Sequence, residues 1–315
     1  MFSRLKHIPK VEARAAVLSL GLGGILLGGK FVAYVMTGSA AVFADALESV
    51  VNVLTAGFAL YALWLAHTPA DKEHPYGHGK VEFLSAGFEG GMMLLAAAVM
   101  VVEGAEALRR GRPVQARLIG AALLVVAMAA NGWLGIYLLQ TGRRNKALSL
   151  EADGKHLLSD AITSVVALAA LALVRLTGWK YADPLGAMLV AIYVARTGLL
   201  LLRRAAAGLM DEQEPADQIL LENILDAHAN PGKKQPRICS YHKLRHRHTG
   251  RYHWVDFHLV VPAWWDVALS HRVAGEIEYE IETALGEGDA TAHVEPCINP
   301  ECVSCREAAM ERENK

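Results

Sequence analysis

Six long apolar runs, separated by short polar stretches, occupy the part of the chain before residue 209. They cover residues 17–36, 40–66, 83–102, 118–139, 157–174 and 185–202. A helix needs about 20 mostly apolar residues to cross a bilayer, and each run approaches or exceeds that length. The pattern predicts an all-α membrane bundle of six transmembrane helices over residues 1–208, and therefore a multi-pass membrane protein.

After residue 208 the chain changes to short alternations of apolar and polar residues, with no run long enough to cross a membrane. Residues 252–261 alternate cleanly, which predicts a half-buried strand. The other expected elements are helices at 216–227 and 267–285 and strands at 238–248 and 290–295. We therefore expect a soluble α+β domain over residues 209–296, followed by a cysteine-containing tail over residues 297–315.

The composition agrees with a membrane protein, since 53% of the 315 residues are hydrophobic and 20% are charged. A net charge of -1 argues against a nucleic-acid partner, which a clear excess of basic residues would mark. On the side that holds both termini, residues 4–14, 72–80, 143–146 and 203–204 contain eleven Lys and Arg, against six in residues 109–117 and 175–180. Because basic residues favour cytoplasmic loops, we expect both termini in the cytoplasm and the helices in a cell inner membrane.

Ionisable and amide side chains interrupt two of the apolar spans. The second span carries Glu48 and Asn52, and the fifth carries His156 and Asp160. Each pair is spaced by four residues, so its side chains share one face of a helix. Two such faces would offer three oxygen donors and one imidazole nitrogen, which suits a tetrahedral divalent ion. The mixed donor set favours zinc or a neighbouring first-row metal over calcium or magnesium.

The alternative is that these side chains only bond one helix to another. Polar residues often do so in membranes, but an ionisable group inside a span costs at least a few kcal/mol and usually marks function. Two matched pairs favour a metal site. For Asp45, one turn before Glu48, structural hydrogen bonding stays equally open, and for Glu89, which precedes two glycines, we expect a buried interhelical bond.

Three segments give the chain a resemblance to a known family. Residues 44–52 (ADALESVVN), 69–80 (PADKEHPYGHGK) and 152–160 (ADGKHLLSD) are similar to motifs of the cation diffusion facilitators, in the same order and at similar spacing. The resemblance implies a homodimer of six-helix protomers, each with a ferredoxin-like cytoplasmic domain. It also implies export of divalent metal from the cytoplasm in exchange for protons, with zinc favoured and iron, cobalt or nickel as alternatives.

The same resemblance implies roles for particular residues. The transport site would contain Glu48, Asn52, His156 and Asp160, with Asp45 nearby. A second metal site would lie on the loop, at Asp71, His74 and His78. A dimer contact would pair Lys80 with Asp211. A regulatory site in the cytoplasmic domain would contain His242, His258, His271, His293 and Glu295.

Some of these positions depart from the family pattern. Glu48 stands where zinc-type members usually have His or Asp, Asn52 where they have Asp, and Glu295 where Asp is commoner. Asn52 keeps an oxygen donor but lacks a charge, whereas His156 differs from the all-oxygen set of manganese-type members. We therefore expect metal preference to be decided at Glu48 and Asn52.

Four cysteines lie in the last part of the chain, where Cys239 stands apart and Cys297, Cys302 and Cys305 cluster near the end. In a reducing cytoplasm, clustered thiols are more often metal ligands or free groups than disulfides. The spacing of the three, with His293 close in sequence, would suit a soft metal. The family motif does not require these thiols, so two interpretations stay equally open: the cysteines bind a metal, or they are free thiols in a tail.

We expect a transporter that works by alternating access, rather than an enzyme. The metal would displace a proton from His156, because imidazole changes its protonation near neutral pH. A membrane-anchored metal sensor would not need charged groups in two spans. An intramembrane metalloenzyme would need a general base or nucleophile, and no sequence motif supplies one.

Overall fold

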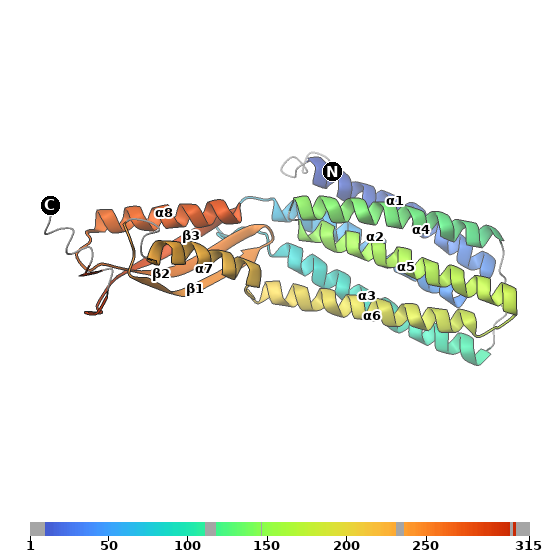
Figure 1. The fold of residues 1–315 in the computed structure, drawn as a ribbon. Coiled ribbons are helices and arrows are strands. Elements are labelled where there is room, and N and C mark those ends of the chain that lie inside the picture. Colours follow the sequence, from blue (N-terminus) through green and yellow to red (C-terminus); the bar gives the residue numbers. More distant parts are fainter. Residues whose placement is uncertain (1–9, 111–117, 146, 231–235, 303–304, 307–315) are drawn as a thin grey trace. The chain divides into compact units, whose positions relative to one another are not determined.

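The structure is a computed structural model that describes residues 10–110, 118–145, 147–230, 236–302 and 305–306 (Figure 1). The chain divides into two compact units, Met1–Leu209 and Met210–Lys315, and each is described by itself. Residues 4–9, 111–117 and 146, which entered the count of basic residues, lie outside the described part, as does most of the expected tail after residue 302.

Six helices make up the described part of the first unit. They are α1 (Lys10–Thr37), α2 (Ala40–Ala66), α3 (Val81–Arg110), α4 (Leu118–Arg144), α5 (Leu148–Thr177) and α6 (Ala182–Leu209). Each is long and apolar enough to cross a membrane. The predicted six-helix membrane bundle is confirmed.

Five of the six helices extend beyond the apolar runs that predicted them, and α2 matches its run. The fifth run was expected from residue 157, whereas α5 begins at Leu148. Hydropathy marks only the part of a helix that faces lipid, while the backbone hydrogen bonds continue through its polar end. His156 therefore lies well inside α5 rather than at its start.

A polar contact joins the first turns of α2 and α6. Gly38, at φ +62°, follows the last residue of α1, and Ser39 then caps α2. Asp183, near the start of α6, accepts hydrogen bonds from the Ser39 hydroxyl and from the Ala40 N–H, the latter at 2.8 Å. A buried helix start leaves N–H groups open, and this carboxylate satisfies one of them.

The packing of α4 against α5 depends on two facing glycines. A methyl group on Gly154 would lie 2.5 Å from the Leu139 backbone nitrogen, and one on Gly135 would lie 3.0 Å from the Gly154 carbonyl oxygen. Small residues allow helix backbones to approach this closely in membranes. Because Gly154 is two residues before His156, this contact also fixes the position of that histidine.

The second unit is a three-stranded sheet with two helices. Its described elements are α7 (Pro215–Ala229), β1 (Ser240–Thr249), β2 (Tyr252–Val261), α8 (Val267–Leu285) and β3 (Gly288–Pro296). The strand order is β1-β2-β3, with β1 antiparallel and β3 parallel to β2. The predicted α-β-β-α-β order and the α+β ferredoxin-like class are confirmed.

The core of this unit lies between one face of the sheet and the helices. Val255, Phe257 and Leu259 of β2 pack with Leu225 of α7 and Ile277 of α8. The alternation of β2 leaves its even-numbered side chains on the opposite face, away from the two helices. The sheet therefore has one apolar face and one face that is free for polar side chains.

We predict that Gly154→Ala destabilises the membrane bundle. The added methyl group would force α4 and α5 apart, and overpacking of this kind costs about 1–3 kcal/mol. Thermal unfolding in detergent should show a lower transition temperature. The matched control is Gly24→Ala on α1, where a methyl group would meet nothing within 4 Å. An equal effect of the two changes would contradict the close contact.

Candidate functional site

Asn52 of α2 contacts two side chains of α5. Its Nδ2 donates a hydrogen bond to Asp160 Oδ2, and its Oδ1 accepts one from His156 Nε2. His156 Nε2 also lies 3.7 Å from Asp160 Oδ1. All three residues are at most 4% exposed. The structure thus brings three of the four expected transport-site residues together in the bundle interior.

Glu48 lies on the same face of α2 as Asn52, but its side chain does not contact Asn52, His156 or Asp160 through a described hydrogen bond. Its Oε2 accepts a 2.6 Å hydrogen bond from the Thr163 hydroxyl, on α5 beyond Asp160. Within the described residues, no set of three His, Cys, Asp or Glu ligand atoms within 4.8 Å of one another includes Glu48. Glu48 Oε1 and Asp160 Oδ1 are buried without a hydrogen-bond partner. Both carboxylates therefore keep an oxygen available for a cation.

Glu89 of α3 approaches the same histidine from its other side. Its Oε1 lies 3.8 Å from His156 Nδ1, and both side chains are buried. The sequence predicted an interhelical contact for Glu89, but no local pattern identified His156 as its neighbour. When a histidine binds metal through one ring nitrogen, a carboxylate beside the other nitrogen keeps the proton on that second nitrogen.

Asp45 belongs to a separate buried ion pair. Its Oδ1 accepts hydrogen bonds from Lys30 Nζ of α1 at 2.9 Å and from the Ser164 hydroxyl of α5 at 2.6 Å. Lys30 is 1% exposed. Lys30 has no signal in the sequence pattern, because a single lysine scarcely changes the hydropathy of its span. The lysine balances the charge of the aspartate, and these contacts join α1, α2 and α5 one turn away from Glu48.

The loop after α2 brings Asp71, His74 and His78 together. His74 Nδ1 lies 3.1 Å from Asp71 Oδ1, and His78 Nε2 lies 3.5 Å from Asp71 Oδ2. A tight turn makes this possible, since Gly77 adopts φ +77°. The hydrogen bond from the His74 backbone N–H is the main cause of a lowered pKa at the exposed Asp71 carboxyl. One ligand atom from each residue falls within 4.8 Å of the others, as a metal site requires.

A second cluster of histidines lies on the polar face of the sheet. Glu295 of β3 contacts His258 Nδ1 at 2.6 Å, His242 Nε2 at 3.3 Å and His293 Nε2 at 3.8 Å. The hydrogen bond with His258 is the main cause of a lowered pKa at the Glu295 carboxyl. His242, His258 and Glu295 offer ligand atoms within 4.8 Å of one another.

A β-bulge puts His242 on that face. From Arg245 onward, β1 pairs with β2 in one register, with Arg245 opposite Asp256. If this register continued back along β1, His242 would lie opposite Leu259, on the apolar face. The register shifts between His242 and Arg245, where Lys243 adopts φ +51°, and His242 instead faces His258. A bulge inserts one residue and re-aims the next side chain, so this site depends on it.

The expected roles of His271 and of the pair Lys80 and Asp211 stay predictions. His271 is exposed on α8, and no contact described for the second unit joins it to Glu295, because α8 packs on the other face of the sheet. Lys80 lies in the first unit and Asp211 in the second, where Arg247 Nη1 lies 3.4 Å from Asp211 Oδ2. The pairing of Lys80 with Asp211 stays a prediction.

Cys239 does not stand apart, and the expectation from sequence was wrong on this point. Its sulfur and those of Cys297, Cys302 and Cys305 all lie within 4.8 Å of one another. Cys239 directly precedes β1 and Cys297 directly follows β3, so the pairing of both strands with β2 brings the two cysteines together. No local sequence pattern signals a contact of this kind.

The clustered thiols affect one another's protonation. Burial raises the pKa of the Cys302 thiol, but hydrogen bonds from the Cys305 backbone and from the neighbouring thiols lower it by more, to about 7. A thiol with a pKa near 7 is partly thiolate at neutral pH, and the thiolate is the form that binds metal.

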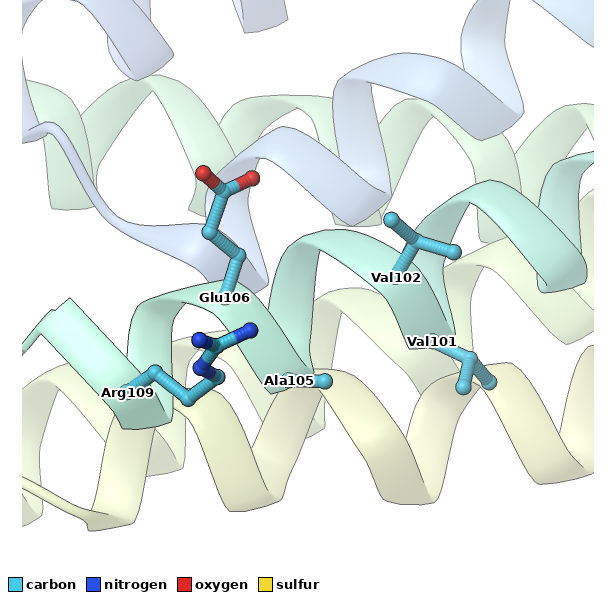
Figure 2. Close-up of a pocket in the computed structure, with 5 residues that line it drawn as sticks. All are labelled: Val101, Val102, Ala105, Glu106 and Arg109. Atoms are coloured by element: carbon cyan, nitrogen blue, oxygen red, sulfur yellow. The ribbon is translucent and has the colours of Figure 1, made fainter.

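A depression along α3 has no comparable donor set among its described residues. Figure 2 shows residues of α3 that line it: Val101, Val102, Ala105, Glu106 and Arg109. These residues offer a single carboxylate beside a guanidinium and apolar side chains, which are too few ligands for a metal ion.

Two family models match the chain. The cation efflux transmembrane domain matches residues 16–210, and the cation efflux protein cytoplasmic domain matches residues 232–297. The first match alone covers more than half of the chain. The chain belongs to the cation diffusion facilitator family. The family predicted from the sequence motifs is confirmed.

Other members of the family match over most of their length. An uncharacterized transporter of Synechocystis, sll1263, is 37% identical over 286 residues, which is 90% of this chain and 90% of that protein. The cation-efflux pump FieF of Shewanella oneidensis is 28% identical over 91% of this chain and 94% of the pump. A solved structure of CzrB in its zinc form, described as a zinc transporter, is 28% identical over 27% of this chain and 91% of that chain, with a TM-score of 0.25.

Membership of the cation diffusion facilitators establishes several general properties. The chain is a multi-pass membrane protein, and members of its family are transporters rather than enzymes. The second matched domain belongs to a family of dimer-forming cytoplasmic domains.

We predict that Lys30→Met strongly destabilises this cation diffusion facilitator. The change leaves the Asp45 carboxylate buried without its cation, and breaking a buried ion pair costs about 3–5 kcal/mol. The double variant Lys30→Met, Asp45→Asn should recover much of the loss, because it removes the unpaired charge and keeps an acceptor for Ser164. Unfolding in detergent measures both. Equal stability of the single variant and the native chain would contradict the pairing.

Proposed function

We propose that the chain exports divalent metal from the cytoplasm in exchange for protons, with zinc as the favoured substrate. The transport site consists of Asn52, His156 and Asp160, joined by Glu48 when metal binds. The main support for this proposal is the contact of Asn52 with both His156 and Asp160. A metal ion bound to these three side chains would replace the two hydrogen bonds that now join α2 to α5.

The hydrogen bonds of Asn52 couple metal binding to a proton. An amide oxygen only accepts, so His156 Nε2 must carry a proton to bond Asn52 Oδ1. A metal needs the lone pair of that nitrogen. In the proposed cycle His156 starts as the imidazolium, with a proton on both nitrogens, and metal binding releases the Nε2 proton to solvent while the Nδ1 proton stays. Glu89, 3.8 Å from Nδ1, would stabilise a proton on the opposite nitrogen while metal is bound.

Charge supports a divalent substrate. Asp160 and Glu48 together balance a 2+ ion, which matters in a buried site where water does not screen charge. Thr163 donates a hydrogen bond to Glu48, and the exchange of this hydrogen bond for a metal ligand would complete a set of four donors. We therefore expect the Glu48 carboxylate to move away from Thr163 when it binds metal.

The remaining clusters support accessory roles. We propose that Asp71, His74 and His78 form a superficial metal site on the loop. His242, His258, His293 and Glu295 form a regulatory site, and His271 completes it where two protomers meet. In the homodimer, Lys80 pairs with Asp211. Both termini lie in the cytoplasm, and the bundle lies in the cell's inner membrane.

Metal uptake into vesicles across a pH gradient tests the proposal. We predict that Asp160→Asn and His156→Asn each reduce zinc uptake by about tenfold or more, because each removes a ligand or the coupled proton. The matched control is Glu151→Gln, a carboxylate on the same helix that contacts Lys155 at 2.5 Å and lies outside the site. Uptake that survives in both site variants would refute the site, and no uptake of zinc, iron, cobalt or nickel by the native chain would refute the function.

We predict that Asn52→Asp tightens zinc binding and weakens the metal-free bundle. The new carboxylate adds charge for the metal, but it faces Asp160 across the position where Asn52 now donates a hydrogen bond. Zinc titration should show a dissociation constant lower by about tenfold or more, because charge attraction is strong in a buried site. Thermal unfolding without metal should show a lower transition temperature. Unchanged affinity would contradict direct metal ligation by this residue.

A further inference from the structure

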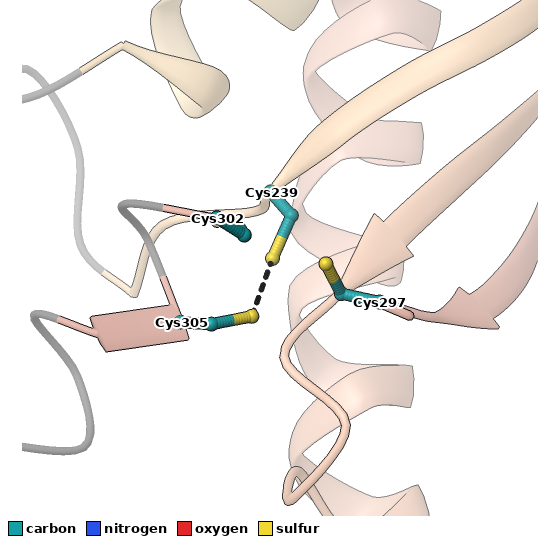
Figure 3. Close-up of side chains that lie close together, drawn as sticks. All are labelled: Cys239, Cys297, Cys302 and Cys305. Atoms are coloured by element: carbon teal, nitrogen blue, oxygen red, sulfur yellow. Dashed lines mark hydrogen bonds between the residues drawn. The ribbon is translucent and has the colours of Figure 1, made fainter. Parts of the chain in front are cut away.

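The cysteines converge at one end of the sheet, where the start of β1 and the end of β3 flank the end of β2. Cys239 directly precedes β1, Cys297 directly follows β3, and Cys302 and Cys305 lie in the segment after it. Figure 3 shows their side chains together, with a dashed line between Cys239 and Cys305. These are the only four cysteines in the sequence, so the cluster contains every thiol of the chain.

The sheet fixes the first two thiols. The Cys239 N–H donates to the Val260 carbonyl at 2.7 Å, and the Cys297 N–H donates to the Val261 carbonyl at 2.8 Å. Both cysteines are therefore held on either side of the end of β2. Two cysteines on a hydrogen-bonded scaffold provide a positioned half of a metal site.

A compact turn carries the other two thiols. The Cys302 N–H donates to the Asn299 carbonyl at 3.2 Å, and the Arg306 N–H donates to the Cys302 carbonyl at 3.2 Å. Arg306 also pairs with Glu301 at 2.5 Å. The Cys-x-x-Cys spacing of Cys302 and Cys305 is common among zinc-binding pairs.

The sulfur separations suit a zinc ion better than a disulfide. Zn–S bonds of about 2.3 Å in a tetrahedron put neighbouring sulfurs about 3.8 Å apart. The Sγ atoms of Cys239 and Cys305 are 3.4 Å apart, and all four ligand atoms lie within 4.8 Å of one another. A disulfide would bring two sulfurs to about 2.05 Å and leave the other two thiols without a role.

We propose that Cys239, Cys297, Cys302 and Cys305 bind one zinc ion in a closed, structural four-thiolate site. It fastens the segment after β3 to the start of β1. Four protein ligands leave no open position for exchange, so this zinc is retained rather than transported. A small domain gains stability from such a link, because its own core is limited. The site shares no ligand with the histidine cluster at Glu295.

Cobalt titration of the full-length protein in detergent, purified with reductant and stripped of metal, tests the proposal. Cobalt bound to thiolates gives a sulfur-to-metal charge-transfer absorption that histidine and carboxylate sites do not give. We expect one equivalent per protomer to produce this absorption and zinc to remove it. Cys239→Ser should abolish it, whereas Ile298→Ser, an exposed change in the same segment, and His258→Ala should leave it intact.

Two further measurements test the same site: the number of thiols that react with and without zinc, and zinc binding by a variant that keeps four donors. With zinc bound, the four thiols should resist a thiol reagent, and removing zinc should expose all four. If Cys239→Ser fails to fold, Cys305→His keeps four donors and should retain one zinc with a weaker charge-transfer band. Absence of the band in the native chain, thiols that stay fully reactive with zinc, or a Cys239–Cys305 disulfide in the reduced preparation would each overturn the proposal. These outcomes do not depend on transport.

Discussion

The two hydrogen bonds that join Asn52 to His156 and Asp160 are the contact on which the membrane unit depends. Water does not reach the hydrocarbon region to solvate polar side chains, so each buried group must find a partner inside the bundle. Asn52 satisfies one imidazole and one carboxylate at once. The same contact joins α2 to α5 and leaves a donor set that a metal ion could take over.

The rest of the bundle supports that contact. Lys30 pairs with Asp45 two turns before Asn52, so this carboxylate of α2 already has a cationic partner. Gly154 lets α5 approach α4 and so fixes the helix that carries His156. The site thus combines a neutralised structural ion pair with carboxylates whose oxygens remain available at Glu48 and Asp160.

Local patterns predicted the elements but not their partners. Hydropathy identified six spans and alternation identified β2, because both patterns depend on neighbouring residues. The spacing of His156 and Asp160 predicted one helix face. Neither the approach of Glu89 to His156 nor the bulge at Lys243 has a local signature, since each depends on how separate elements pack. The same reason explains why Cys239 was thought to stand apart.

Anomalous diffraction from zinc-loaded crystals would show whether Asn52, His156 and Asp160 bind the metal. We expect a zinc peak between α2 and α5, about 2.0–2.2 Å from His156 Nε2 and an Asp160 oxygen. The hydrogen bond between Asn52 and His156 should be broken, and Glu48 should have left Thr163. An absence of zinc at this position, with both Asn52 hydrogen bonds intact in crystals that hold zinc elsewhere, would contradict the account.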